Sequence, residues 1–330
     1  MVRSTADRRE YAPQKGAQID YNPQVHTISD YDPTVDVYWK DIENERAIFR
    51  TLFEIQRPLV LKGPTGSGKT TFVRRMHLDI GNELKDKRHV PAYVLDESTG
   101  IYVKNTDTTE RAPTFPLYII DGTEDTEIIH ILGGFSHTGR FIGGPMYHWA
   151  HTGGILLVNE IAELRGDVQT IFHSPLDKER TVWIPDLERI VKLPDHAMLV
   201  AAYNPGYQSK RHPLKISTKQ RLPAMEFRYP PAEVEAEIVY NASRVRDQQV
   251  DMQTAKKLAD LAAKIRSRDK EESALANREG VSTRLLVMAA EMIASGLSTT
   301  DACRTAIVHP LASTEKKAEA LEAIVHMCGL

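Results

Sequence analysis

The stretch Gly63-Pro-Thr-Gly-Ser-Gly-Lys-Thr-Thr71 governs the interpretation of this 330-residue chain. It matches the pattern G-x-x-x-x-G-K-[ST], in which a glycine-rich turn wraps phosphate groups with backbone N–H groups. Glycine leaves room for the phosphates, and a following helix adds its positive N-terminal end. The apolar run at residues 57–62 predicts a buried strand, and Lys69–Leu84 predicts a helix. The sequence therefore predicts a phosphate-binding cradle between a strand and a helix.

The whole cradle is a candidate nucleotide-binding segment, with ATP and Mg²⁺ as the expected cofactors. Lys69 is expected to reach the β- and γ-phosphates, and the Thr70 hydroxyl is expected to ligate Mg²⁺. The predicted nucleotide contacts are Gly63, Pro64, Thr65, Gly66, Ser67, Gly68, Lys69, Thr70 and Thr71.

A second apolar run, Ile155–Val158, ends in the polar pair Asn159-Glu160. Glu160 is expected to polarise an attacking water as a general base. Asn159 is expected at the metal position, where its amide oxygen can accept from metal-bound waters. Proteins with such a cradle normally carry an aspartate there, so Asn159 removes a charge.

Three further polar residues follow in the chain. Asn204 ends the apolar run 197–202, where it could orient the water or the γ-phosphate. Arg221 precedes a strand-like segment, and an isolated arginine of this kind is usually a surface charge. Arg284 opens an amphipathic helix capped by Ser282 or Thr283. A cation near a helix N-terminus is electrostatically unfavourable, which suggests an anionic partner for Arg284.

Composition divides the chain into three parts. Residues 1–41 are predicted to be a polar N-terminal arm, flexible or loosely docked, because they show no periodic pattern of apolar residues. Residues 42–229 alternate short apolar strands with helices, which predicts an α/β core with a parallel, doubly wound sheet. Within that core, residues 85–114 are a turn-rich insertion, either a loop or a hairpin. Residues 230–330 read as amphipathic helices, which predicts a smaller all-helical domain.

Charge and composition exclude several classes. A net charge of -3 gives no electrostatic basis for binding nucleic acid or an anionic membrane. The two cysteines, Cys303 and Cys328, cannot form a disulfide framework. The apolar runs fall far short of the roughly 18 residues needed to cross a membrane, and the N-terminus lacks a signal-peptide core. A cytoplasmic protein without membrane insertion is therefore expected.

Together these motifs resemble the AAA+ ATPases of the MoxR class, and more narrowly the CbbQ/NorQ/NirQ branch. The resemblance runs from about Ile48 to the C-terminus. It is carried by GPTGSGKT, by GTEDTEIIHILGGF…RFIGGPMYHWAHTGGILLVNEIAELRGDV, by AAYNPGYQS and STKQRLPAMEF, and by the tail from STRLLVMAAEM to TAIVHPL.

The resemblance implies a P-loop AAA+ core followed by a helical lid, and it implies roles for three residues. Asn204 matches the sensor asparagine, Arg221 the arginine finger that acts on a neighbouring subunit, and Arg284 the sensor arginine of the lid. Gly143–His151 resembles an insertion that faces the pore of the ring, and Thr181–Val191 resembles a second hairpin there.

Members of this branch form homo-hexameric rings and work with a partner carrying a von Willebrand factor A domain. They remodel, activate or mature a metabolic client enzyme, often metal- or radical-dependent; Rubisco and nitric oxide reductase are clients. The resemblance thus implies an ATP hydrolase that acts as a chaperone-like activase.

The alternative to an ATP hydrolase is a nucleotide-gated assembly module with slow or no hydrolysis, and Asn159 is the residue that favours this alternative. The helical domain and Arg221 argue against a small-molecule kinase.

Overall fold

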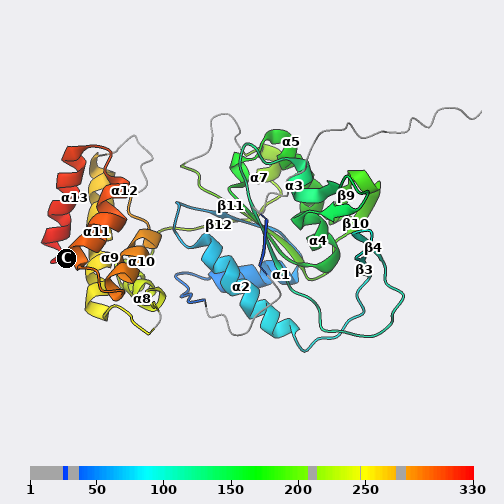
Figure 1. Cartoon of the computed structure of the whole chain (residues 1–330), viewed down its shortest axis with the longest axis horizontal. Helices are drawn as coiled ribbons and strands as arrows, with labels where there is room; N and C mark the ends of the chain where they lie inside the picture. Colours follow the sequence, from blue (N-terminus) through cyan, green and yellow to red (C-terminus); the bar gives the residue numbers. More distant parts are fainter. Residues whose placement is uncertain (1–24, 29–36, 207–213, 246, 273–279) are drawn as a thin grey trace, which may run out of the picture.

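The computed structural model describes residues 25–28, 37–206, 214–245, 247–272 and 280–330. These residues form a six-stranded sheet in the order β1-β5-β8-β11-β2-β12 (Figure 1). Its parallel strands are β5 (Leu117–Asp121), β8 (Gly154–Asn159), β11 (Ala197–Tyr203), β2 (Leu59–Lys62) and β12 (Ala224–Glu226). The predicted parallel sheet is confirmed. Its strands all end at the same edge, where the cradle also begins.

Helices cover both faces of the sheet. One face packs on α1 (Glu45–Glu54) and α2 (Lys69–Leu84), with Phe49 and Phe72 among the buried side chains. The opposite face packs on α3 (Ile128–Leu132) and α4 (Pro145–Thr152). Successive strand residues point to opposite faces, so Leu157 of β8 joins the first core and Val158 joins the second. This two-sided burial explains why these strands are continuous apolar runs.

The edge strand β1 (Val25–Ile28) pairs antiparallel with β5. This strand falls in the segment interpreted as a polar arm. The sequence did not indicate it, because the arm shows no periodic pattern of apolar residues. Residues 1–24 and 29–36 of that arm lie outside the described residues.

Three hairpins and several short helical segments complete the core. The hairpin β3 (Tyr93–Asp96)–β4 (Ile101–Lys104) lies within residues 85–114. The hairpin β9 (Thr181–Ile184)–β10 (Arg189–Lys192) agrees with the second hairpin expected at this place. The third is β6 (Gly133–Phe135)–β7 (Phe141–Gly143). The short helices are α5 (Gly166–Gln169), α6 (His173–Leu176) and α7 (Ile216–Lys219), with single turns at Ile161–Glu163, Thr170–Phe172 and Pro185–Leu187.

The segment Gly143–His151, expected from the resemblance to be an insertion that faces the pore of a ring, is largely helical. Most of it lies in α4, where Tyr147 and Trp149 are fully buried in the core. Trp149 donates to the Gly154 carbonyl at 3.1 Å, and the His151 ring stacks on Tyr102 with centroids 4.3 Å apart. Burial lowers the pKa of His151 to about 4, so the ring stays neutral at physiological pH.

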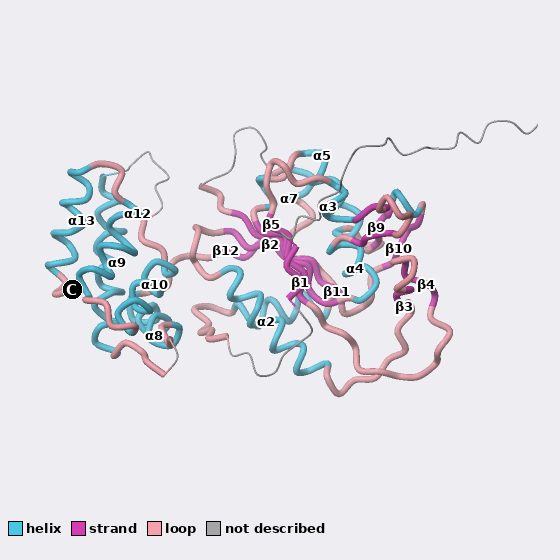
Figure 2. The backbone as a smooth tube through the Cα atoms, in the orientation of Figure 1, coloured by secondary structure: helices cyan, strands magenta, loops and turns pink. Residues whose placement is uncertain are grey.

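After the core the described chain is helical, as predicted (Figure 2). This lid contains α8 (Ala232–Ala242), α9 (Met252–Glu272), α10 (Thr283–Ala294), α11 (Thr299–Cys303), a π-helical stretch Arg304–Val308, α12 (His309–Leu311) and α13 (Glu315–Met327). It has its own hydrophobic core, separate from the two that flank the sheet. Helix α8 ends at its C-cap, Ser243. No helix among the described residues has a stretch long and apolar enough to span a membrane.

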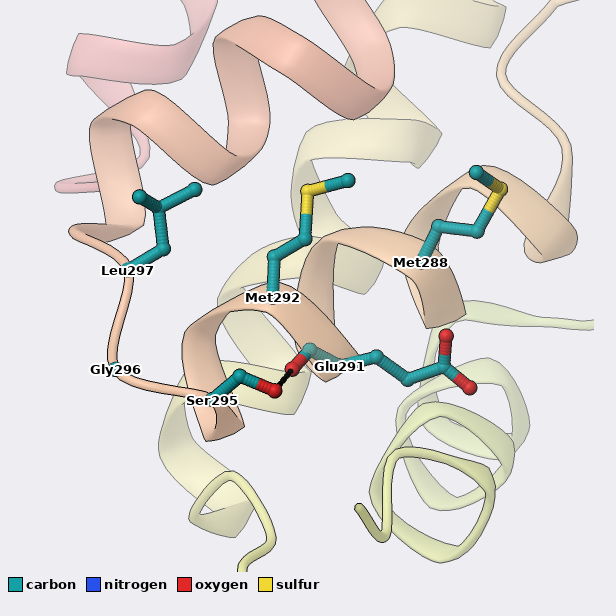
Figure 3. A pocket seen from close by; sticks show the side chains of 6 residues that line it. All are labelled: Met288, Glu291, Met292, Ser295, Gly296 and Leu297. Atoms are coloured by element: carbon teal, nitrogen blue, oxygen red, sulfur yellow. Dashed lines mark hydrogen bonds between the residues drawn. The ribbon is translucent and has the colours of Figure 1, made fainter.

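The lid also contains an open hollow of about 480 Å³ on α10 and the turn after it (Figure 3). It is lined by Met288, Glu291, Met292, Ser295, Gly296 and Leu297. None of the predicted site residues lines it, so it is separate from the cradle.

Candidate functional site

The cradle forms a tight turn between β2 and α2. Gly66 and Gly68 have φ of 71° and 91°, a region that glycine enters without strain, and Gly68 caps α2. A Cβ atom on Gly66 would lie 2.6 Å from the Ser282 Cβ, and one on Gly63 would lie 2.4 Å from the Phe227 carbonyl oxygen. Gly66 and Gly68 therefore permit the turn, Gly66 also permits the close approach of the lid, and Gly63 permits the close approach of Phe227 of the core.

The Lys69 side chain is only 8% exposed. Its ammonium donates to the carbonyl oxygens of Gly63 and Pro64, each at 2.8 Å. The Ser67 hydroxyl also donates to Pro64 at 2.8 Å. The loop thus holds a cation beside the first N–H groups of a sixteen-residue helix, an arrangement suited to an anion such as phosphate.

The ends of two neighbouring strands contribute amide side chains to the cradle. Asn159 ends β8, and its Oδ1 accepts from the Thr70 hydroxyl at 3.4 Å. Asn204 follows β11, is 5% exposed, and donates from Nδ2 to the Thr65 hydroxyl at 3.4 Å. The structure therefore brings Thr70, Asn159 and Asn204 together at one loop, as the sequence predicted.

Glu160 lies directly beyond β8 with a φ of 48°, which is uncommon for a residue with a side chain. The turn is fixed by two backbone hydrogen bonds, from Gly122 to Asn159 at 2.9 Å and from Glu163 to Glu160 at 2.8 Å. A Cβ atom on Gly122 would lie 2.8 Å from the Glu160 carbonyl oxygen. Such constrained conformations concentrate at functional sites, which agrees with a chemical role for Glu160.

The lid contributes Arg284 at the start of α10. Ser282 is the N-cap, since its side chain accepts from the Leu285 N–H, and this resolves the choice between Ser282 and Thr283. The Arg284 Cβ would be 3.4 Å from a Cβ atom on Gly66. The base of the Arg284 side chain therefore lies against the cradle.

A chain of contacts that the sequence did not indicate ties the lid to the cradle. The Tyr229 hydroxyl donates to the Thr65 carbonyl at 3.0 Å, and the Arg266 guanidinium lies 4.0 Å from the centre of the Tyr229 ring. Arg266 donates two hydrogen bonds to Glu235, at 2.7 and 2.8 Å. The fully buried Glu235 also accepts from Thr283 at 2.5 Å, next to Arg284. These contacts link the cradle backbone to the start of α10.

Trp39 also lies beside the cradle, although the sequence placed it in the polar arm. Its ring packs against Phe72 and Phe227, with centroids 5.0 and 5.9 Å apart, and a Cβ atom on Gly68 would lie 3.1 Å from it. Its neighbour Lys40 pairs with Glu237 of α8 at 2.5 Å. Residues 39–40 therefore connect the core to the lid next to the cradle.

Arg221 lies beyond α7 and makes a different set of contacts. It pairs with Asp177 at 2.6 Å and donates to the Ser217 carbonyl at 2.8 Å, with a third of its side chain exposed. Neither Asp177 nor Ser217 belongs to the cradle of the same chain. The structure thus brings Asn159, Asn204 and the base of Arg284 to the cradle, with Glu160 next to Asn159 in the chain, and places Arg221 elsewhere.

Comparison with known proteins agrees with this geometry. A family model for an AAA domain of the dynein-related subfamily matches residues 105–222, and a CbbQ/NirQ/NorQ C-terminal model matches residues 235–328. Protein CbbQ of Hydrogenophilus thermoluteolus is 33% identical over 277 residues, covering 83% of this chain and 88% of the relative. Protein NorQ of Paracoccus denitrificans is 31% identical over 271 residues, covering 81% and 85%. The regulatory protein NirQ of Stutzerimonas stutzeri is 30% identical over 294 residues, covering 88% and 91%.

A P-loop core with a parallel sheet and a helical lid is the architecture of an AAA+ ATPase. Within that class, this chain belongs to the CbbQ/NirQ/NorQ family of MoxR-type AAA+ ATPases.

The buried pair Glu235–Arg266 yields a stability prediction. Glu235→Gln removes the charge that compensates a guanidinium only 13% exposed, so the lid should lose about 3–5 kcal/mol of unfolding free energy. Urea unfolding followed by circular dichroism measures the loss. The matched control is Glu237→Gln on the same helix, whose partner Lys40 is 42% exposed, and it should change nothing measurable. Equal effects from the two substitutions would contradict the structural role of the pair.

Proposed function

We propose that this ATPase binds ATP with Mg²⁺ at the cradle and hydrolyses it between subunits of a ring in order to remodel a client enzyme. The observation that carries the proposal is the convergence of Lys69, Thr70, Asn159 and Asn204 on one loop at the edge of a parallel sheet. Ligands of open parallel sheets bind at this edge, outside the carboxyl ends of the strands.

The residues present are compatible with Mg²⁺. The Thr70 hydroxyl and the Asn159 amide oxygen lie 3.4 Å apart, and both are the oxygen donors that this ion prefers. Among the described residues there is no group of three or more His, Cys, Asp or Glu side chains placed to hold a metal. That agrees with an ion that takes most of its ligands from nucleotide phosphates and water. Bound Mg²⁺ would neutralise charge on the phosphates.

Each remaining site residue receives one task in this proposal. Lys69 would exchange its carbonyl partners for the β- and γ-phosphates, and Arg284 would contact the phosphates from the lid. Glu160 would accept a proton from the attacking water, which Asn204 would help to orient. Arg221 would act on the nucleotide of the neighbouring subunit, which is consistent with its contacts away from its own cradle.

Ring assembly and partners follow from the family relationship. We infer a homo-hexamer, a partner protein with a von Willebrand factor A domain, and a metabolic client enzyme that depends on a metal or a radical. A second candidate function is a nucleotide-gated assembly module with slow or no hydrolysis. The uncharged Asn159 favours it, since a neutral amide holds a hydrated Mg²⁺ less strongly than a carboxylate does.

Two cradle variants separate binding from turnover. Lys69→Ala removes the cation on the phosphates and should abolish ATP binding, whereas Glu160→Gln should retain binding and lose turnover. Calorimetric ATP titration and phosphate release measure the two properties. An Lys69→Ala protein that binds and hydrolyses ATP like the parent would overturn the cradle assignment. A parent that binds ATP without measurable turnover would support the assembly module.

The shared site yields a separate prediction about Arg221. Arg221→Ala should bind ATP nearly normally and lose about 10³-fold or more in turnover, because an arginine acting in trans stabilises charge in the transition state. Mixing it with Glu160→Gln subunits should restore part of the turnover, since some interfaces regain both intact residues. Arg228→Ala, at an arginine 82% exposed, is the control and should remain fully active. Full turnover by diluted monomers of Arg221→Ala would refute the shared site.

A further inference from the structure

The amide of Asn159 lies between the cradle and a carboxylate on the neighbouring strand. Its Oδ1 accepts from the Thr70 hydroxyl at 3.4 Å, while its Nδ2 donates to Asp121 Oδ1 at 2.8 Å. Asp121 ends β5 and is the register partner of Asn159 in the parallel β5–β8 ladder. A carboxylate is therefore present at this edge of the sheet, displaced by one strand from the position where a cradle of this kind normally has one.

We propose that Asp121 supplies the negative charge of the Mg²⁺ site that position 159 lacks, and that Asn159 positions this carboxylate relative to Thr70. The inference rests on the proposed function, in which Mg²⁺ and a nucleotide bind at the cradle. Asp121 is a positioning residue in this scheme, because it acts through the Asn159 amide and through water.

The chemistry of the amide supports this assignment. A carboxylate only accepts hydrogen bonds, so Asn159 must turn its NH₂ group toward Asp121, and its carbonyl oxygen then faces Thr70. This orientation directs an oxygen, the atom that can accept from metal-bound water, toward the hydroxyl that ligates the metal. Outer partners of this kind fix the orientation of the groups around a metal and tune its affinity.

Electrostatics explains why an asparagine occupies position 159. An aspartate there would place two carboxylates in contact, at the 2.8 Å that now separates Asn159 from Asp121. Like charges this close cannot both ionise without a cation between them. Asp121 and Asn159 are therefore a matched pair, in which the acid stands on β5 and the amide on β8.

The test isolates the charge from the hydrogen bond. Asp121→Asn keeps an oxygen that can accept from Asn159 and removes only the charge. The measurement is the Mg²⁺ concentration at half-maximal binding of a fluorescent, non-hydrolysable ATP analogue. Asp121→Asn should raise this midpoint about tenfold or more, the usual cost of losing an outer partner of a metal site. Glu124→Gln, which removes a carboxylate from the loop after β5, is the control and should leave the midpoint unchanged.

The exchange of the two residues gives the second measurement. Asp121→Asn combined with Asn159→Asp restores one acid and one amide, and should return the midpoint to within about threefold of the parent, because coupled residues are not additive. Asn159→Asp alone should lower the melting temperature in EDTA through carboxylate repulsion. Mg²⁺ should restore that melting temperature, and the Mg²⁺ midpoint should fall below that of the parent.

The outcomes distinguish this inference from the proposed function. If Asp121→Asn has the Mg²⁺ midpoint of the parent while Lys69→Ala abolishes binding of the analogue, the role of Asp121 is refuted and the nucleotide site stands. If Asn159→Asp alone melts in EDTA like the parent, the two side chains are not in contact and the pair is refuted as well. If Lys69→Ala binds the analogue normally, the proposed function itself fails. Asp121→Glu retains the charge, so its Mg²⁺ midpoint should stay within about threefold of that of the parent. It is the control for any effect on folding of a substitution at position 121.

Discussion

The parallel pairing of β5, β8, β11 and β2 is the constraint on which the candidate site depends. Backbone hydrogen bonds hold Asp121 opposite Asn159 and Tyr203 opposite Lys62, so the polar residues that end these strands reach one edge together. Because both faces of the sheet are buried under helices, a slip in register would misplace the apolar side chains as well as the polar ends. The same packing that stabilises the core therefore positions the residues around the cradle.

One of the links between the lid and this edge passes through a buried ion pair of the lid. Removing two charges from water is costly, and a pair such as Glu235–Arg266 is retained more readily for the geometry it imposes than for net stability. Here the geometry connects the Thr65 carbonyl, through Tyr229 and Arg266, to Thr283 beside Arg284. On the proposed function, a nucleotide that rearranged the cradle would bias the lid through these contacts.

Much of the fold could be predicted because it depends on local pattern. The bounds of α2 match the predicted helix Lys69–Leu84, and α10 begins at one of the two predicted caps, Ser282. Glycines precede the first helix, and both helices have apolar residues at helical spacing. Contacts between distant segments could not be predicted. The Asn159–Asp121 hydrogen bond spans 38 positions, and predicting it requires knowledge of the register between β5 and β8. Trp39 lies in a segment without a periodic pattern of apolar residues, so its packing against Phe72 could not be predicted either. The burial of Tyr147 in α4 is of the same kind, because its hydroxyl accepts from the Tyr102 N–H, 45 positions away in the chain.

Asn159 shows how a local departure from a motif can be consistent with the whole site. Judged alone, an amide at the metal position favours a protein that binds nucleotide without hydrolysing it. When Asp121 is considered as well, the amide of Asn159 is compatible with a carboxylate at position 121, because it donates a hydrogen bond to it. A second carboxylate at position 159 would instead repel Asp121. On the proposal made above, the negative charge then stands on β5, one strand away from Asn159. A motif defined along one strand cannot detect Asp121, because this residue is adjacent in the sheet and 38 positions away in the sequence.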